Sequence, residues 1–311
     1  MKTVLARPAR ATSFACMVAA VTLPTLSSAT AGEKPGLSPL KGSEMSFAPA
    51  QIQLNPDGSV MRGPRSAIVT KNWAGYIIRY VQTGELYTSV SASWMIPTVI
   101  YYFHDPSFAL EASSIWVGIG AACLDNSYLT QATCDNKDHS LIQVVTAQQA
   151  TPTGTTYVAK YEMLPNPAVT IPITVNPGDR VTGSVRCVAD CSSATQTWAL
   201  ALTNETTGAV WGPQNFAYAS RESSAEWIEE APSASAGILP LADFDVASVG
   251  VQMEANGKTP MLTLQDNGMI MMNPWGQWAK PSQSDPGQSG LFAFGVCWYD
   301  SAPGSIPCLS P

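Results

Sequence analysis

The stretch Arg180-Val181-Thr182-Gly183-Ser184-Val185-Arg186-Cys187-Val188 alternates between polar and apolar residues along most of its length. Such alternation is typical of a β-strand that is buried on one face. A second run of this kind, Thr195–Thr203, follows after a short segment rich in Ser. The turn residues Pro177-Gly178 and Thr206-Thr207-Gly208 bound the pair. The stretch therefore predicts two strands set between turns.

The same pattern extends outward from this stretch in both directions. Further apolar or alternating runs are Trp73–Tyr80, Tyr87–Ile96, Ser114–Ile119, Ser140–Ala147, Thr156–Met163, Ala225–Glu230, Val246–Met253 and Leu291–Tyr299. No run of about 12 residues has helical periodicity, and 24 Pro and 23 Gly punctuate the chain. The sequence therefore predicts an all-β protein, a single antiparallel β-sandwich.

The N-terminus has the features of a signal peptide. Its three cations are Lys2, Arg7 and Arg10. A mostly apolar stretch, Ser13–Leu26, comes next, and Ala29-Thr30-Ala31 has the small-x-small pattern of a cleavage site. We expect residues 1–31 to be removed and the protein to be secreted, to the extracellular or periplasmic side.

The stretch from Gly32 to about Arg65 is rich in Pro, Gly, Ser and Gln and has weak periodicity. It is interpreted as a pro-segment or a flexible arm. Residues 66–311 are then expected to form the single β-sandwich domain.

Charged residues make up 13% of the chain, about half the usual share. A surface of Ser, Thr, Asn, Gln and Gly changes little when carboxylates are protonated, which suits an acidic medium. The formal net charge is −7. Nucleic acid and anionic membranes are bound through clustered cations, so neither is expected as a partner.

The cysteines indicate disulfides. Cys16 would leave with the signal peptide. The remaining cysteines are Cys123, Cys134, Cys187, Cys191, Cys297 and Cys308. An even number in an oxidising compartment favours disulfides, although sequence cannot choose among the connectivities. Pairing of nearest neighbours is the simplest hypothesis. A metal site is disfavoured, because there is no Cys-x-x-Cys and the chain has two histidines.

The sequence lacks the residues that several classes of hydrolase require. His104 and His139 are the histidines, and neither a Gly-x-Ser-x-Gly elbow nor a His-Glu-x-x-His helix occurs. No cofactor is expected. Carboxyl and amide side chains remain, and a carboxyl group can act as general base or acid at low pH.

Five motifs together carry a resemblance. They are Asn72-Trp73-Ala74-Gly75, Ser114-Ile115-Trp116-Val117-Gly118-Ile119-Gly120, Leu141-Ile142-Gln143, Tyr161-Glu162-Met163-Leu164-Pro165 and Ala225-Glu226-Trp227-Ile228-Glu229-Glu230-Ala231-Pro232. Their order and spacing from about Asn72 to Phe244 resemble those of the glutamic peptidases, or eqolisins. The resemblance implies two curved, packed antiparallel sheets with the active site on the concave face.

The resemblance also implies roles for individual residues. Gln143 and Glu230 match the catalytic pair, Trp116 matches a tryptophan that lines the cleft, and Glu162 matches the glutamate of the Tyr-Glu segment. Strand alternation puts Glu226, Ile228 and Glu230 on one face. Glu226 is therefore expected near the cleft, although Glu230 is the residue that matches the catalytic position.

The chain departs from the family's pattern around this pair. Gly120 and Ala147 stand where acids are often found, and Val158 and Lys160 replace Asp and Trp. Lys160 could enter the cleft and pair with Glu162, or lie solvated at its rim. These departures indicate a divergent branch, and the leader is consistent with a bacterial one.

The resemblance predicts an endopeptidase acting on polypeptides as a monomer. Two alternatives remain open at this point. A glycoside hydrolase would need two carboxyl groups about 5–9.5 Å apart, and Glu230 with Glu162 could supply them. A carbohydrate-binding module could keep the fold without catalysis, and the nine Trp residues would suit sugar stacking.

Overall fold

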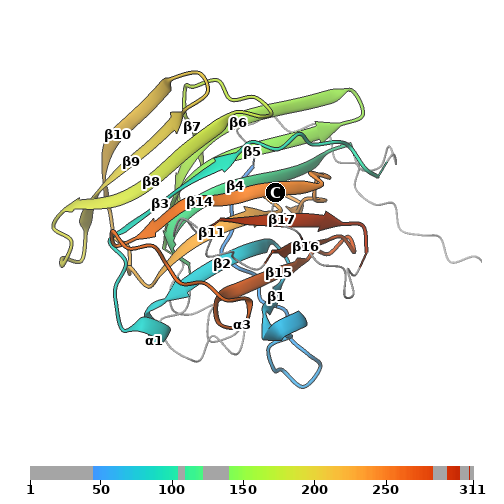
Figure 1. The fold of residues 1–311 in the computed structure, drawn as a ribbon, viewed down its shortest axis with the longest axis horizontal. Coiled ribbons are helices and arrows are strands. Elements are labelled where there is room, and N and C mark those ends of the chain that lie inside the picture. The colour runs from blue at the N-terminus through green and yellow to red at the C-terminus, as the bar shows by residue number, and fades with distance from the viewer. Residues whose placement is uncertain (1–44, 104–108, 122–139, 283–292, 302–307, 309–311) are drawn as a thin grey trace, which may run out of the picture. The chain divides into compact units, whose positions relative to one another are not determined.

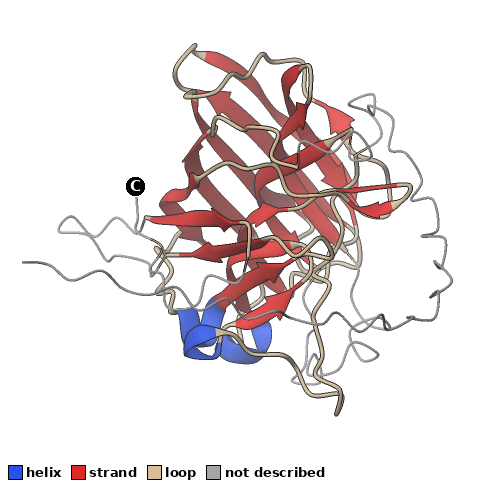
Figure 2. Ribbon diagram, turned by 90° about the vertical axis from the view of Figure 1, so that its right-hand side faces the viewer, coloured by secondary structure: helices blue, strands red, loops and turns tan. Residues whose placement is uncertain are grey.

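The computed structural model describes residues 45–103, 109–121, 140–282, 293–301 and 308 (Figure 1). Strands dominate this part of the chain, as Figure 2 shows, and the α-helices α1 (Tyr80–Thr83) and α3 (Leu264–Asn267) are single turns. None of the helices described is long and apolar enough to cross a membrane. The prediction of an all-β fold is confirmed.

The strands of this domain include one within each of the predicted runs and seven outside those runs. They are β1 (Ile68–Thr70), β2 (Trp73–Arg79), β3 (Ser89–Met95), β4 (Glu111–Gly120), β5 (Leu141–Thr151), β6 (Gly154–Met163), β7 (Val169–Thr170), β8 (Arg180–Ala189), β9 (Gln196–Asn204), β10 (Ala209–Tyr218), β11 (Ser224–Glu230), β12 (Ser233–Ala234), β13 (Gly237–Ile238), β14 (Val246–Ala255), β15 (Gly268–Met272), β16 (Trp278–Pro281) and β17 (Phe294–Tyr299). A 3-10 turn spans Pro64–Ser66.

Most strands belong to one continuous ladder. Its order is β10-β9-β8-β3-β14-β17-β16-β15-β2-β11-β4-β5-β6-β7, with β1 paired in parallel to β15. The other pairings of the ladder are antiparallel. The ladder turns back on itself, so that β3, β8, β9 and β14 pack against β11, β4 and β5. The result is a sandwich of two layers.

Two apolar clusters cover the two faces of the layer that contains β2, β11, β4 and β5. The larger cluster fills the space between the layers and includes Trp94, Trp198 and Trp227. The second cluster lies on the opposite face and includes Trp73 and Trp116. Because strand side chains alternate, each of these strands contributes to both clusters.

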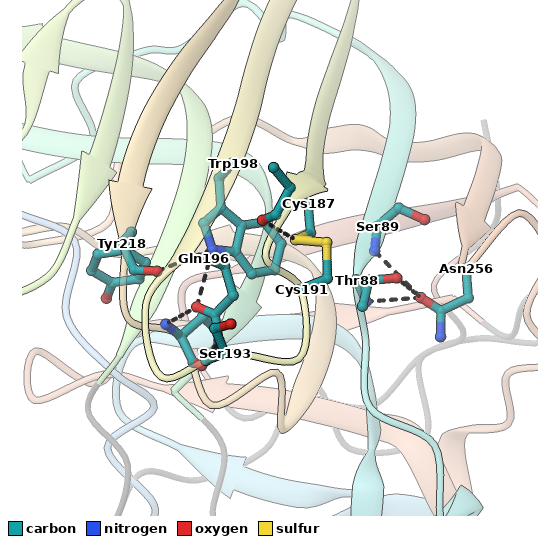
Figure 3. Close-up of a disulfide and its surroundings, with 11 residues drawn as sticks. Thr88, Ser89, Cys187, Cys191, Ser193, Gln196, Trp198, Tyr218 and Asn256 are labelled. Atoms are coloured by element: carbon teal, nitrogen blue, oxygen red, sulfur yellow. Dashed lines mark hydrogen bonds between the residues drawn. A yellow bond between two sulfur atoms is a disulfide. The ribbon is translucent and has the colours of Figure 1, made fainter.

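The described disulfides join nearest neighbours in the sequence. Cys187 is bonded to Cys191, and Cys297 is bonded to Cys308. Figure 3 shows the first of them beside Trp198; Cys187 belongs to β8 and Cys191 to the turn between β8 and β9. Two of the three predicted pairs are thus confirmed. The third pair, Cys123 with Cys134, lies outside the described residues.

Residues 45–65, the described part of the predicted pro-segment or arm, are folded against the domain. Backbone bridges join Ser46 to Ser233, Ile52 to Thr70 and Arg62 to Ile68. The buried side chains of this segment, which we call the N-terminal arm, are Met45, Phe47, Ile52 and Val60. They belong to the second apolar cluster. The description as a flexible arm therefore does not fit residues 45–65, and their removal as a pro-segment stays a prediction.

Gly75, from the first motif, is required by the contact between β2 and β11. Its φ is 145°, and a Cβ atom there would lie 2.2 Å from the carbonyl oxygen of Trp227. Gly75→Ala is therefore expected to lower the free energy of unfolding by about 3 kcal/mol or more. Urea denaturation measures the change. The control is Gly208→Ala, with a φ of 76° and no neighbour within 4 Å, which should lose only about 1 kcal/mol. Equal losses would contradict this account.

Candidate active site

The predicted site residues lie on one face of four neighbouring strands, β11, β4, β5 and β6. Ile228 belongs to the second apolar cluster, whereas Trp227 belongs to the core between the layers. Glu226 and Glu230 therefore share the face of Ile228, as strand alternation predicts. Register then places Glu230 opposite Ser114 of β4, Gln143 opposite Gly118 of β4, and Glu162 of β6 opposite Gln143 of β5.

Glu230 ends β11 in a fully buried position and is held by three N–H donors. The indole Nε1 of Trp116 donates to Oε2 at 2.8 Å. The backbone N–H of Ala48 donates to Oε1 at 3.0 Å, and Asn72 Nδ2 donates to the same oxygen at 3.4 Å. Trp116 is itself positioned by an edge-to-face contact with Trp73, whose ring centroid lies 4.8 Å away. These donors orient the carboxyl group.

Burial raises the pKa of Glu230 well above its usual value. The charge of Glu162 raises this pKa further, while the hydrogen bonds from Ala48, Trp116 and Asn72 oppose the rise. With the N-terminal arm in place, Glu230 therefore keeps its proton to a higher pH than an exposed glutamic acid does.

Gln143 and Glu162 form a side-chain pair on β5 and β6. Gln143 Nε2 donates to Glu162 Oε2 at 2.9 Å, and both residues are buried. Gln143 Oε1 has no hydrogen-bond partner among the described residues. Burial raises the pKa of Glu162 to about 7, against the hydrogen bonds from Phe47 and Gln143 and the charge of Lys160. One N–H and the carbonyl of the Gln143 amide are thus left for other partners.

Two adjacent backbone amides connect the two glutamates. The N–H of Phe47 donates to Glu162 Oε1 at 3.5 Å, and that of Ala48 donates to Glu230 Oε1 at 3.0 Å. Consecutive amides are a few ångströms apart, so the side chains of Glu162 and Glu230 converge on one short length of chain. The backbone of the N-terminal arm therefore crosses the strand face that presents Glu162 and Glu230, as a peptide lying on the site.

Several groups anchor this peptide beyond the two glutamates. Asn72 Nδ2 donates to the carbonyls of Ala48 and Pro49, and its Oδ1 accepts from the N–H of Gln51. Trp73 Nε1 also donates to Ala48 O, at 2.9 Å. Asn72 belongs to one of the sequence motifs, but no role was predicted for it. Phe47 and Ala48 were not predicted as site residues. The only local signal for these two was that the arm has apolar residues without strand alternation.

Lys160 lies on the same strand face as Glu162, and its side chain is completely buried. The interpretation of a solvated lysine at the rim is therefore wrong. The expected close pair with Glu162 is also absent: Nζ has no hydrogen-bond partner among the described residues. Burial lowers the pKa of Lys160, and the charge of Glu162 opposes this.

The two other glutamates of β11 are also buried. Glu226 lies across Gly118 from Gln143, because both face this glycine in register. Glu229 points to the opposite face, and burial raises its pKa well above the usual value. In the described residues, no group of His, Cys, Asp and Glu has an arrangement that could hold a metal ion.

A β-sandwich that gathers carboxyl groups and an amide on one covered face has the groups for acid and base catalysis. Comparison with protein families names its class. The chain belongs to the Peptidase A4 family, the glutamic peptidases, whose model matches residues 71–285. It is thus a glutamic-type endopeptidase, a hydrolase of polypeptides. The N-terminal arm precedes the matched residues.

The other comparisons add less. Among solved structures, the crystal structure of aspergilloglutamic peptidase from Aspergillus niger is similar, with 20% sequence identity and a TM-score of 0.40. The match covers 61% of this chain and 99% of that chain. The search of curated proteins finds no match. Family membership replaces the two alternatives, a glycoside hydrolase and a carbohydrate-binding module, with a peptidase.

Proposed function

We propose that this chain is a secreted acid endopeptidase whose catalytic pair is Gln143 and Glu230. The observation that supports this proposal most directly is that a peptide segment of the chain itself, the N-terminal arm, already lies on the site. Adjacent amides of that peptide donate to Glu230 and to Glu162, the partner of Gln143. A site that aligns an extended backbone between these groups is suited to binding a scissile peptide bond.

In the proposed reaction, ionised Glu230 takes a proton from water, and the water oxygen attacks the scissile carbonyl carbon. The developing oxyanion accepts a hydrogen bond from the second N–H of Gln143, the one not donated to Glu162. Glu230 then gives the proton to the leaving nitrogen as the C–N bond breaks. An amide suits the stabilisation of the oxyanion because its N–H donors do not titrate.

The neighbouring residues are proposed to bind substrate. Trp116 orients Glu230 through its indole N–H, and Glu162 orients Gln143. Glu226 and Lys160 line the same face. We assign these four residues to the cleft of the processed enzyme.

Residues 32–65 are proposed to be a pro-segment, of which the N-terminal arm is the part that the structure describes. In this state the arm covers the proposed catalytic pair, because Gln143 and Glu230 are both fully buried. Secretion through the leader of residues 1–31 is likewise proposed, and N-terminal sequencing of the exported chain tests cleavage after Ala31. The disulfides Cys187–Cys191 and Cys297–Cys308 are typical of an extracellular protein.

Replacement of Gln143 by alanine tests the proposed function. After removal of the arm, Gln143→Ala is expected to lower kcat about 10²- to 10³-fold, because the oxyanion loses a donor. The measurement is digestion of a denatured protein and of peptides at about pH 3–4. Gln149→Ala is the matched control, because Gln149 is a buried glutamine on the same face of β5. Wild-type kcat in Gln143→Ala would refute this role of the glutamine.

A further inference from the structure

Lys160 is a buried cation that the proposed mechanism does not use. Its side chain has no exposed surface, and its Nζ has no hydrogen-bond partner among the described residues. An ammonium group that is buried without hydrogen bonds is unfavourable for folding. A ligand that brings hydrogen-bond acceptors to Nζ would remove this cost.

Strand register places Lys160 beside the proposed catalytic pair. Lys160 of β6 shares a row across the sheet with Trp116 of β4, through β5 between them. The next row on the same face holds Gln143 and Glu162, and the next row on the other side holds Glu230. Lys160 is therefore level with the space between the two glutamates that the backbone of the N-terminal arm contacts. A peptide that spans these glutamates, as the arm does, passes the row of Lys160.

The charge of Lys160 is not balanced on this face in an acidic medium. Acid keeps Lys160 charged even though burial lowers its pKa. Burial raises the pKa of Glu162 to about 7, so this carboxyl group is neutral in acid. Glu230 and Glu226 are the other titratable groups among the described residues of the face, and neither is hydrogen-bonded to Nζ. Residues 45–55 of the arm contain neither Asp nor Glu, so they supply no carboxylate to it.

We propose that Lys160 is a specificity-determining residue, whose ammonium group binds the carboxylate side chain of an Asp or Glu that lies within two residues of the scissile bond in the substrate. This inference rests on the proposed function and names the polypeptides that the enzyme favours. A carboxylate brings the acceptors that Nζ lacks. A hydrogen bond between two charged groups in a covered cleft is also stronger than one between neutral groups.

Matched peptides test this specificity. The two peptides of a pair differ only in having Glu or Gln at one position near the scissile bond, because these side chains have nearly the same size. Once the arm of the full chain has been cleaved, wild type is expected to cleave the Glu peptide with a kcat/KM about tenfold higher at one such position. The assay is run at about pH 5, where a glutamate in a peptide is mostly ionised.

Variants of Lys160 should change this ratio in a defined way. Lys160→Met should bring the ratio of the Glu to the Gln peptide to about one, and Lys160→Glu should instead favour a Lys at the same position. Lys280→Met, at another buried lysine on β16, should keep the tenfold ratio. The ratio is taken within each variant, so a loss of folded protein affects both peptides equally. Equal cleavage of both peptides by wild type at all positions, or a preference that survives in Lys160→Met, would overturn the proposal.

A binding measurement separates this proposal from the proposed function. In a Glu230→Gln background, which removes the proposed general base, fluorescence anisotropy gives the Kd of each labelled peptide with Lys160 present and with Lys160→Met. The Glu peptide should bind about tenfold more tightly than the Gln peptide when Lys160 is present. If wild type cleaves no peptide, the proposed function fails, whereas a Kd ratio that depends on Lys160 still supports the acidic subsite. A Kd ratio of about one would overturn it.

Discussion

Glu230→Gln is expected to lower kcat of the processed enzyme by about 10³-fold or more, with KM little changed. A glutamine has nearly the size of a glutamic acid, and its carbonyl oxygen can still accept from Trp116 Nε1, which lies 2.8 Å from the carboxyl oxygen. It cannot take a proton from water or return one, so only the acid and base chemistry is removed. The measurement is steady-state cleavage of a peptide at acid pH, with thermal unfolding to verify the fold.

The neighbouring glutamates of β11 provide the controls. Glu229 is as buried as Glu230 but lies on the strand face of Trp227, toward the core between the layers, and burial raises its pKa well above the usual value. Glu229→Gln is therefore expected to change kcat by less than about twofold. Glu226 shares the face of Glu230. If Glu226→Gln abolished kcat while Glu230→Gln did not, the assignment of the general base would be wrong.

Weakening the N-terminal arm is expected to activate the unprocessed chain. Phe47 is a fully buried member of the second apolar cluster. Truncation of a buried Phe to Ala costs about 3–5 kcal/mol. Because Phe47 belongs to the arm, we expect much of this loss to fall on the closed state. Phe47→Ala should raise the activity of the uncut chain about 10²-fold, whereas Ser59→Ala, at an exposed position of the same segment, should not.

Acid by itself is expected to hold the arm more firmly. With the arm in place, the pKa of Glu162 is raised from 4.5 to about 7 by burial. An open cleft returns water to this group, so its pKa should fall toward the usual value. The closed state then binds the proton more tightly. Its extra stability is full below about pH 4.5, is lost as the pH rises through about 7, and amounts to about 3 kcal/mol at most.

Release of the arm should therefore need cleavage of the chain. Hydrogen exchange of the Phe47 and Ala48 amides, corrected for intrinsic rates, should show increasing protection from pH 8 to pH 5 in uncut chain. Activity should appear together with a new N-terminus, and the exposed residues 56–59 are accessible to a protease. An uncut wild-type chain that is fully active at pH 4, with both amides exchanging freely, would contradict this expectation.

The strands and their faces were predictable from sequence because they depend on local alternation. The run Arg180–Val188 became β8, and Ala225–Glu230 became most of β11. Parity alone separated Glu230 and Glu226 from Glu229. The pairing of Cys187 with Cys191 was also predictable, since a short loop brings the two cysteines together. These features need no knowledge of which strands are neighbours.

Contacts between distant segments were not predictable in this way. The pairing of Gln143 with Glu162 depends on β5 and β6 being adjacent in register. The hydrogen bond from Trp116 to Glu230 depends on β4 lying next to β11. The family resemblance supplied candidates for these residues, but alternation along one strand contains no information about the strand beside it.

The sequence by itself determined an all-β chain, the two faces of its strands and the carboxyl and amide residues that one face presents. Tertiary structure decided that the arm occupies this face, that its Phe47 and Ala48 amides bind Glu162 and Glu230, and that Lys160 is buried. The reason is that burial, and the pKa shifts it causes, depend on what covers a residue. Here the arm that contacts Glu162 and Glu230 lies more than a hundred residues away from both in sequence.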